Sequence, residues 1–258
     1  MNSVVLAFRQ VRYENSAFWR NPAAAFFTIV FPLMFLVIFN LIFGSQEVTD
    51  ENGNTYNLST FYVPGIMVFA VVGATYTNVA MGIAFARDGG LLKRVRGTPL
   101  PSWSYLAGKI VHSILLTVLL VVIVAGAGWL AFGVDLPTNK LPAVLLTLAI
   151  AAATFCTLGL AVTSIIPNAD AAPAIVNASI LPLLFVSDVF IPLDDAPVWL
   201  TTLADVFPVR HMALAMHSAF NPFEAGAGFE WAHLLVMAAW LVAGALFTIR
   251  FFRWEPRR

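Results

Sequence analysis

Charged residues are scarce in this sequence. They make up 11% of its 258 residues, whereas 60% are hydrophobic and the mean hydropathy is +0.84. A soluble domain of this length is usually about one quarter charged. The composition therefore excludes an ordinary soluble protein and predicts an integral membrane protein.

Cysteine is nearly absent, since Cys156 is the only one and lies in an apolar run. One thiol excludes both a disulfide framework and a cysteine-based zinc site. A cleavable signal peptide is not expected either. The first twenty residues carry four charges and show no clean apolar core followed by a small-residue cleavage site.

Nucleotide-binding and catalytic motifs are also missing. The sequence holds no G-x-x-x-x-G-K-[ST], no H-E-x-x-H and no G-x-S-x-G, and the pair Gly108-Lys109 lacks the rest of a phosphate loop. The acidic pair Asp194-Asp195 has no second carboxylate cluster, which favours solvated loop charge over a metal site. We expect no catalytic residue, no metal site and no cofactor in this chain.

The four histidines do not predict a ligand set. His211 and His217 are six residues apart and are poorly placed for one helical face. His112 and His233 stand alone in the sequence, so we expect all four to be packed or interfacial side chains.

Long apolar runs are what the sequence has instead. A membrane helix needs roughly 20 mostly apolar residues. Six runs meet or approach this length, which predicts an all-α membrane protein with six transmembrane helices. The expected spans cover residues 22–43, 61–85, 110–132, 141–166, 171–187 and 231–252, of which the fifth is short.

The positive charges fix an orientation for these spans. Short cytoplasmic loops are enriched in Lys and Arg. If the N-terminus is cytoplasmic, only Lys140 and Arg210 of the 14 cations lie outside, while most acidic residues do. We therefore predict a multi-pass protein with both termini in the cytoplasm.

Two further segments are apolar but cannot span. In residues 1–20, apolar and basic side chains recur at helical spacing, which predicts an interfacial amphipathic helix or, alternatively, an ordinary soluble amphipathic turn. In residues 188–230, prolines bound two short apolar stretches at 198–204 and 209–220. We expect these to be helices that re-enter the outer leaflet, with a packed surface loop as the alternative.

The segment 87–101, RDGGLLKRVRGTPLP, is the largest predicted cytoplasmic loop. Leu91, Leu92 and Val95 form one small apolar face of a short helix, which suits a groove on a partner protein. Its cations suit acidic partner residues or lipid phosphates. The simpler alternative is that they only fix topology and bind anionic lipid.

Three segments resemble one known family, the ABC-2 type membrane subunits of ATP-binding cassette exporters. The likeness is to daunorubicin and multidrug-resistance permeases of the actinobacterial type. It is carried by RDGGLLKRVRGTPL (87–100) with Gly108-Lys109, by residues 181–216, and by the basic amphipathic N-terminus. It covers nearly the whole chain and implies a single ABC-2 transmembrane domain over 1–258. Asp88 stands where the family more often has Glu, and Asp188 where Gly is usual.

The resemblance implies a function for the basic segment. It would form a cytoplasmic coupling helix that, with the N-terminal helix beside it, docks on a separate ATP-binding subunit carrying ATP and Mg²⁺. Two such subunits and a second permease, identical or a paralogue, would complete an exporter in the bacterial cell membrane, with lipid around it and no nucleic-acid partner. The expected docking residues are Arg87, Asp88, Leu91, Leu92, Lys93, Arg94, Val95 and Arg96.

Polar residues within or beside spans are the candidates for a path taken by a hydrophobic or amphiphilic substrate, such as a drug or lipid. They are Asn40, Thr75, Tyr76, Thr77, Asn78, Asn177, Ser179 and Asp188. Hydrogen bonding between helices is an equally good interpretation of each. Alternative functions are an ion-gradient-driven transporter or channel, a polysaccharide or glycolipid exporter, a lipid-acting enzyme, and a non-transporting partner of an ATPase.

Overall fold

Helices make up most of the fold, as the sequence predicts. The computed structural model describes residues 3–49, 55–98, 100–193, 196–224 and 226–255. Its α-helices are α1 (Ser3–Trp19), α2 (Pro22–Phe43), α3 (Ser59–Val72), α4 (Asn78–Asp88), α5 (Leu91–Arg96), α6 (Ser102–Phe132), α7 (Leu141–Val162), α8 (Ala172–Phe185), α9 (Val198–Ala204), α10 (Pro208–Phe220) and α11 (Trp231–Phe251). A π-helical stretch, η1 (Gly73–Thr77), joins α3 to α4, and a 3₁₀ turn, η2 (Thr138–Lys140), precedes α7.

A small antiparallel hairpin was not expected from the sequence. Strand β1 (Glu47–Thr49) pairs with β2 (Thr55–Asn57), with Val48 opposite Tyr56. Val, Thr and Tyr favour extended backbone, which accounts for the pairing in this polar connection.

Five helices in the described part of the chain are long and apolar enough to cross a membrane. They are Pro22–Phe43, Ser59–Asp88, Trp103–Phe132, Thr138–Val162 and Trp231–Phe251, and they match the predicted first, second, third, fourth and sixth spans. The predicted fifth span corresponds to α8, which has 14 residues. At 1.5 Å per residue it is about 21 Å long, short of a hydrocarbon core of about 30 Å. The count of six spans therefore stays a prediction.

The helix that contains the predicted third span begins before residue 110 because a charge is tolerated inside it. Helix α6 starts at Ser102, and Lys109 is its eighth residue. The ammonium group of Lys109 pairs with Glu14 of α1 at 3.0 Å, so the charge is neutralised where the helices meet. Gly108 allows this contact, because a Cβ there would lie 2.5 Å from the side chain of Gln10.

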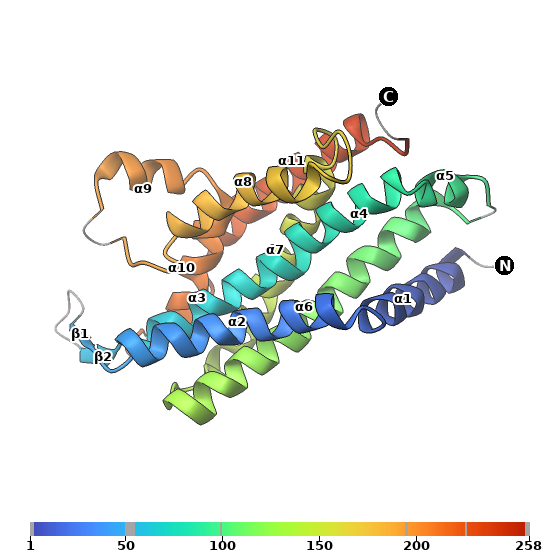
Figure 1. The fold of residues 1–258 in the computed structure, drawn as a ribbon. Coiled ribbons are helices and arrows are strands. Elements are labelled where there is room, and N and C mark those ends of the chain that lie inside the picture. The colour runs from blue at the N-terminus through green and yellow to red at the C-terminus, as the bar shows by residue number, and fades with distance from the viewer. Residues whose placement is uncertain (1–2, 50–54, 99, 194–195, 225, 256–258) are drawn as a thin grey trace.

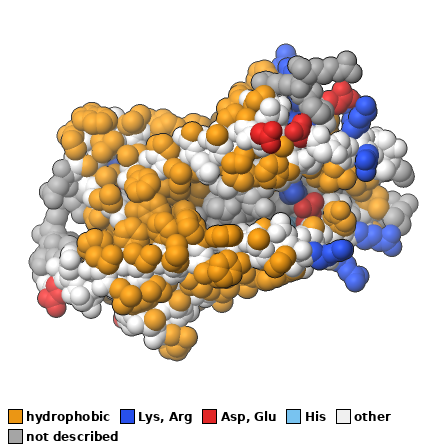
Figure 2. Space-filling model, viewed as in Figure 1, with side chains coloured by type: hydrophobic (Ala, Val, Ile, Leu, Met, Phe, Trp, Pro, Cys, Tyr) orange, Lys and Arg blue, Asp and Glu red, His pale blue; other side chains and the backbone are white. Residues whose placement is uncertain are grey.

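The long helices lie side by side, and the two ends of the bundle differ (Figure 1). Both termini and α5 lie at one end, here called the α5 end. The hairpin β1–β2 and α9 lie at the other, here called the hairpin end. Figure 2 shows Lys and Arg gathered at the α5 end and a broad hydrophobic surface between the ends. This distribution agrees with the charge segregation expected from the sequence.

The span formed by α3 and α4, together with α7, makes up the centre of the bundle. About two thirds of the most apolar window in each is buried, against 17% in α2 and 22% in α11. Side chains such as Leu41, Leu130 and Ile249 on α2, α6 and α11 are largely exposed instead. Apolar side chains on the outside suit a hydrocarbon surrounding, and the buried centre holds the helices together by packing.

The two short helices predicted between residues 188 and 230 are present, and they differ. Helix α10 packs against α3, α7 and α11, and Val209, Met212 and Met216 are fully buried. Helix α9 stands outside, with Val198 79% and Trp199 67% exposed. The pair Asp194-Asp195 before α9 lies outside the described residues.

Candidate functional site

Helix α5 is a short basic helix at the surface of the α5 end. Gly90, with φ of +72°, turns the chain out of α4, a conformation that glycine adopts without strain. The side chains of Lys93, Arg94 and Arg96 are exposed. Arg96 makes a long 3.8 Å ion pair with Glu255, and both side chains are exposed. The cations of α5 are therefore accessible to a partner.

The apolar face of α5 points into the chain, which corrects the sequence-based expectation. Leu92 is fully buried and Val95 packs beside it, in a cluster with Tyr105, Phe252 and Trp254. Of the three residues expected to face a partner groove, only Leu91 is exposed, at 38%. Helical spacing identified the face correctly, but the cluster beneath α5 occupies it.

Arg87 and Asp88 differ from the other predicted docking residues. Arg87 is 2% exposed, and its guanidinium donates to the carbonyl of Thr163, at 2.8 Å, and to that of Ile166. The carboxylate of Asp88 accepts from the backbone N–H of Ala169 at 3.0 Å. Arg87 is therefore buried rather than exposed to a partner, and both residues bind the turn that joins α7 to α8.

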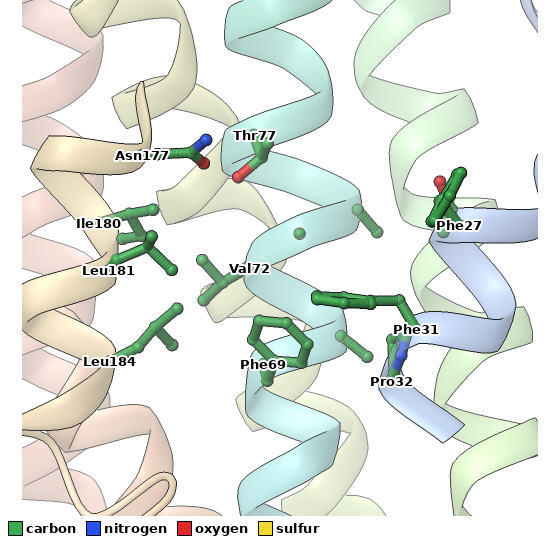
Figure 3. Close-up of a pocket in the computed structure, with 14 residues that line it drawn as sticks. Phe27, Phe31, Pro32, Phe69, Val72, Thr77, Asn177, Ile180, Leu181 and Leu184 are labelled. Carbon is green, nitrogen blue, oxygen red and sulfur yellow. The ribbon is translucent and has the colours of Figure 1, made fainter. Parts of the chain in front are cut away.

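An apolar groove runs between α2, the α3–η1 span and α8, with a cavity of about 260 Å³. Figure 3 shows Phe27 and Phe31 of α2 on one side and Ile180, Leu181 and Leu184 of α8 on the other, with Phe69 and Val72 between them. The amide of Asn177 and the hydroxyl of Thr77 lie at one end of the groove. The lining is thus apolar over most of its length and polar at one end.

Other predicted pathway residues bond within the bundle rather than lining this groove. The Tyr76 and Ser179 hydroxyls are 2.6 Å apart and join η1 to α8. The hydroxyl of Thr75 donates to Val71 O, and the Asn40 amide donates to Leu36 O. Asn78 approaches Ser113 only at 3.5 Å, which is at the limit of a hydrogen bond.

Tyr76 and Ser179 also line a second apolar cavity, of about 250 Å³, on the other side of α8. This cavity lies against α7, α10 and α11, with Phe155, Val209 and Trp240 in its wall. Helix α8 therefore has open volume on two sides.

Asp188 lies at the hairpin end, outside the groove. Its φ of +55° is left-handed, which accounts for a glycine being usual at this position in the family that the sequence resembles. Its carboxylate accepts from Leu193 N at 2.8 Å and from Arg210 Nε at 2.9 Å. Arg210 also donates to Asp205 and to the carbonyl of Thr201. Asp188 thus closes a turn within a partly buried charged network.

Two histidines of this end form a pair that the sequence did not reveal. The Nδ1 atoms of His211 and His233 are 2.8 Å apart, and Nε2 of His211 donates to the carbonyl of Asp205 at 2.8 Å. With Nε2 of a neutral His211 protonated, its Nδ1 accepts from His233. The sequence suggested that His233 is isolated, but in the structure it is bonded to His211. The sequence held no signal for the pair, because the two residues are 22 positions apart and lie on different helices.

His217 stacks on Phe61 and donates to the carbonyl of Asp188 at 2.7 Å. Burial lowers the pKa of its imidazole, and the hydrogen bond to Asp188 opposes that shift. Within the described residues, no group of three or more His, Cys, Asp or Glu side chains is placed to hold a metal ion.

The ABC-2 type transporter family model matches residues 7–221. This chain belongs to the ABC-2 type transporter family. This chain is 26% identical over 244 residues to the daunorubicin resistance ABC transporter permease protein DrrB1 of Streptomyces coeruleorubidus. The aligned residues cover 92% of this chain and 82% of DrrB1. This chain is also 28% identical over 238 residues to the transport permease ycf38 of Cyanophora paradoxa, covering 90% and 75%.

A third relative is the multidrug ABC transporter permease YbhR of Escherichia coli K12. It is 24% identical over 170 residues, which cover 65% of this chain and 46% of YbhR. These organisms are diverse, so the likeness reaches beyond an actinobacterial type. Membership makes this ABC-2 permease a transport permease of an ABC system, in a family of non-catalytic membrane subunits that work with an ATP-binding cassette partner.

Proposed function

We propose that this permease is the membrane subunit of an ATP-driven exporter in a bacterial cell membrane. It moves a hydrophobic or amphiphilic small molecule, drug-like or lipid-like, from the cytoplasm or inner leaflet to the outside. Two permeases, identical or paralogous, each bind one ATP-binding subunit that holds ATP and Mg²⁺. The α5 end and both termini face the cytoplasm. The observation that carries the proposal is the exposed basic helix α5 at the charged end of a bundle of this family.

Helix α5 is suited to receive force from the ATP-binding subunit. Its exposed cations complement acidic residues on a partner, and Leu91 supplies a small apolar contact between them. Its buried face is fixed to α6 and the C-terminal segment through Leu92. A push on α5 is therefore passed to the spans rather than absorbed by a loose loop. Helix α1 lies against α6, and the ion pair of Glu14 with Lys109 holds these two helices together.

The groove between α2, α3 and α8 is the proposed substrate path. Its aromatic wall suits an apolar body, and Asn177 with Thr77 suits a polar group, which together favour an amphiphile. Asn177 is exposed in the single chain, and an amide in contact with lipid is unfavourable. A second permease, water or substrate therefore covers this side in the assembled exporter.

The docking role is tested by copurifying the permease with any ATP-binding cassette protein that is encoded beside it. Leu91→Asp is the test and Leu136→Asp the matched control, because these leucines are 38% and 37% exposed. Leu91 begins α5, whereas Leu136 follows the last residue of α6, which ends away from the α5 end. We expect Leu91→Asp to reduce the copurified partner at least tenfold, about 1.4 kcal/mol, and Leu136→Asp to leave it unchanged. Equal recovery with both variants would remove α5 from the interface.

The path is tested by transport into inside-out vesicles, with a lipophilic dye such as ethidium as the probe. Asn177→Leu fills the polar end of the groove, whereas Ala174→Leu adds the same side chain at an exposed position of α8 outside it. We expect Asn177→Leu to lower dye accumulation several-fold at equal expression, and Ala174→Leu to preserve it. If both variants transport alike, the groove is not the path.

A further inference from the structure

Arg87 and Asp88 connect the last turn of α4 to a part of the chain about 80 residues away. The Arg87 guanidinium donates to Thr163 O and Ile166 O, and the Asp88 carboxylate accepts from Ala169 N. These acceptors and this donor belong to residues 163–171, the turn between α7 and α8. The two side chains and their three hydrogen bonds are called here the Arg87–Asp88 bridge.

We propose that the Arg87–Asp88 bridge transmits displacement of α5 to α8, and that neither side chain contacts the ATP-binding subunit. Arg87 and Asp88 are thus positioning residues for the transport cycle. The proposal rests on the proposed function, since it takes α5 as the place where the ATP-binding subunit acts.

The bridge is stiff because Arg87 is buried. A cation removed from water is tolerated only where its N–H groups are hydrogen-bonded, so separation of α4 from the turn would leave a buried charge without its acceptors. Thr163 and Ile166 follow the C-terminus of α7, where free carbonyls and the helix dipole favour a positive charge. The two segments therefore move together.

The chain segments that link the bridge to α5 and to α8 are also short. Only Gly89 and Gly90 separate Asp88 from the first residue of α5. On the other side, Ala169 lies three residues before Ala172, where α8 begins, and the amide oxygen of Asn168 accepts from Ala171 N to close the turn. Displacement of α5 therefore reaches the start of α8 without crossing a long flexible segment.

Helix α8 has room to respond. The groove of about 260 Å³ lies on one side and the second apolar cavity of about 250 Å³ on the other. Densely packed helices resist displacement, whereas a helix beside open volume can shift with fewer clashes. Because α8 also lines the proposed path, its movement would change the width of that path.

The test uses the complex of permease and ATP-binding subunit, with a bimane fluorophore at Ala178→Cys on α8 in a Cys156→Ser background. Ala178 is exposed, whereas Cys156 is buried and free. Emission is recorded before and after ATP, Mg²⁺ and vanadate. Asp88→Asn keeps an oxygen that accepts from Ala169, and Asp88→Ala removes it. Asp88 is exposed, so neither change threatens the fold.

We expect the emission shift in the parent and in Asp88→Asn, a smaller shift in Asp88→Ala, and none in Arg87→Gln/Asp88→Ala. Partner recovery and ATP hydrolysis remain at parent levels, which a merely structural defect would not allow. If the double variant does not assemble, Asp88→Ala alone decides.

A full emission shift without the bridge overturns the proposal, as does a parent complex whose emission does not change. If Asp88→Asn and Asp88→Ala both lose the partner, Asp88 docks through its charge and the proposal is wrong. If the parent chain binds no ATP-binding subunit, the proposed function fails first and this proposal fails with it.

Discussion

The two ends of the bundle use their cations differently. At the α5 end, Lys93, Arg94 and Arg96 project from a surface helix. At the hairpin end, Lys140 and Arg210 turn inward, and each donates to acceptors of the same chain. The hairpin end thus uses these two cations to complete its own fold. The α5 end also holds internally bonded cations, Arg87 and Lys109, but in addition it presents exposed ones to other molecules.

At the hairpin end, a few charged side chains hold the chain segments around α10 together. The Nζ of Lys140 donates to the carbonyls of Ser218 and Asn221, at 2.8 and 3.1 Å, and so caps the last turn of α10. Glu230 accepts from the Ser218 hydroxyl at 2.9 Å and joins the start of α11 to the same turn. Together with Arg210, these contacts hold a segment that has no long helix of its own.

The largest expected effect is a difference in stability between losing a cation at the hairpin end and losing one at the α5 end. Arg210→Ala leaves Asp188 without its ion pair, and loss of one partner of a largely buried pair costs about 3 kcal/mol. Arg94→Ala removes an exposed cation and should change stability by less than about 0.5 kcal/mol. The measurement is thermal unfolding of the purified permease in detergent, followed by tryptophan fluorescence. Equal melting temperatures would mean that the hairpin-end network does not hold the fold.

Local pattern predicted the helices well because it depends on neighbours along the chain. The stretches 198–204 and 209–220 were located from their prolines and apolarity, and α9 and α10 match them closely. The early start of α6 was missed because the charge-free run begins only at Ile110, directly after Lys109. Only the contact with Glu14, 95 residues away in sequence, allows that charge within the helix.

The candidate site was less predictable for the same reason. Spacing placed Leu91, Leu92 and Val95 on one face of α5, but what lies beneath that face depends on α6 and the C-terminal segment. Arg87 looked like one more cation of a basic loop, and its acceptors lie in a turn 76 and 79 residues away. The sequence shows which residues are charged, but only the tertiary contacts show which charged side chains are exposed and which are buried.

A smaller effect would show how much of the hairpin end depends on backbone conformation rather than on charge. Asp188→Gly and Asp188→Ala both delete the carboxylate that binds Arg210 and Leu193 N. They differ in the cost of the left-handed backbone, since φ is +55° there and a Cβ costs roughly 1–2 kcal/mol in that conformation.

Asp188→Gly should therefore be the more stable of the two by about 1 kcal/mol, although both fall below the parent. The two melting temperatures, measured together in the same detergent, check this. If alanine equals glycine, the turn has relaxed out of its left-handed conformation once the carboxylate is gone. The ion pair with Arg210 and the bond to Leu193 would then be what hold that conformation. If glycine is better, the backbone conformation is imposed by the packing of the neighbouring Val189 carbonyl against Gly65 of α3, where an added Cβ would clash with that oxygen.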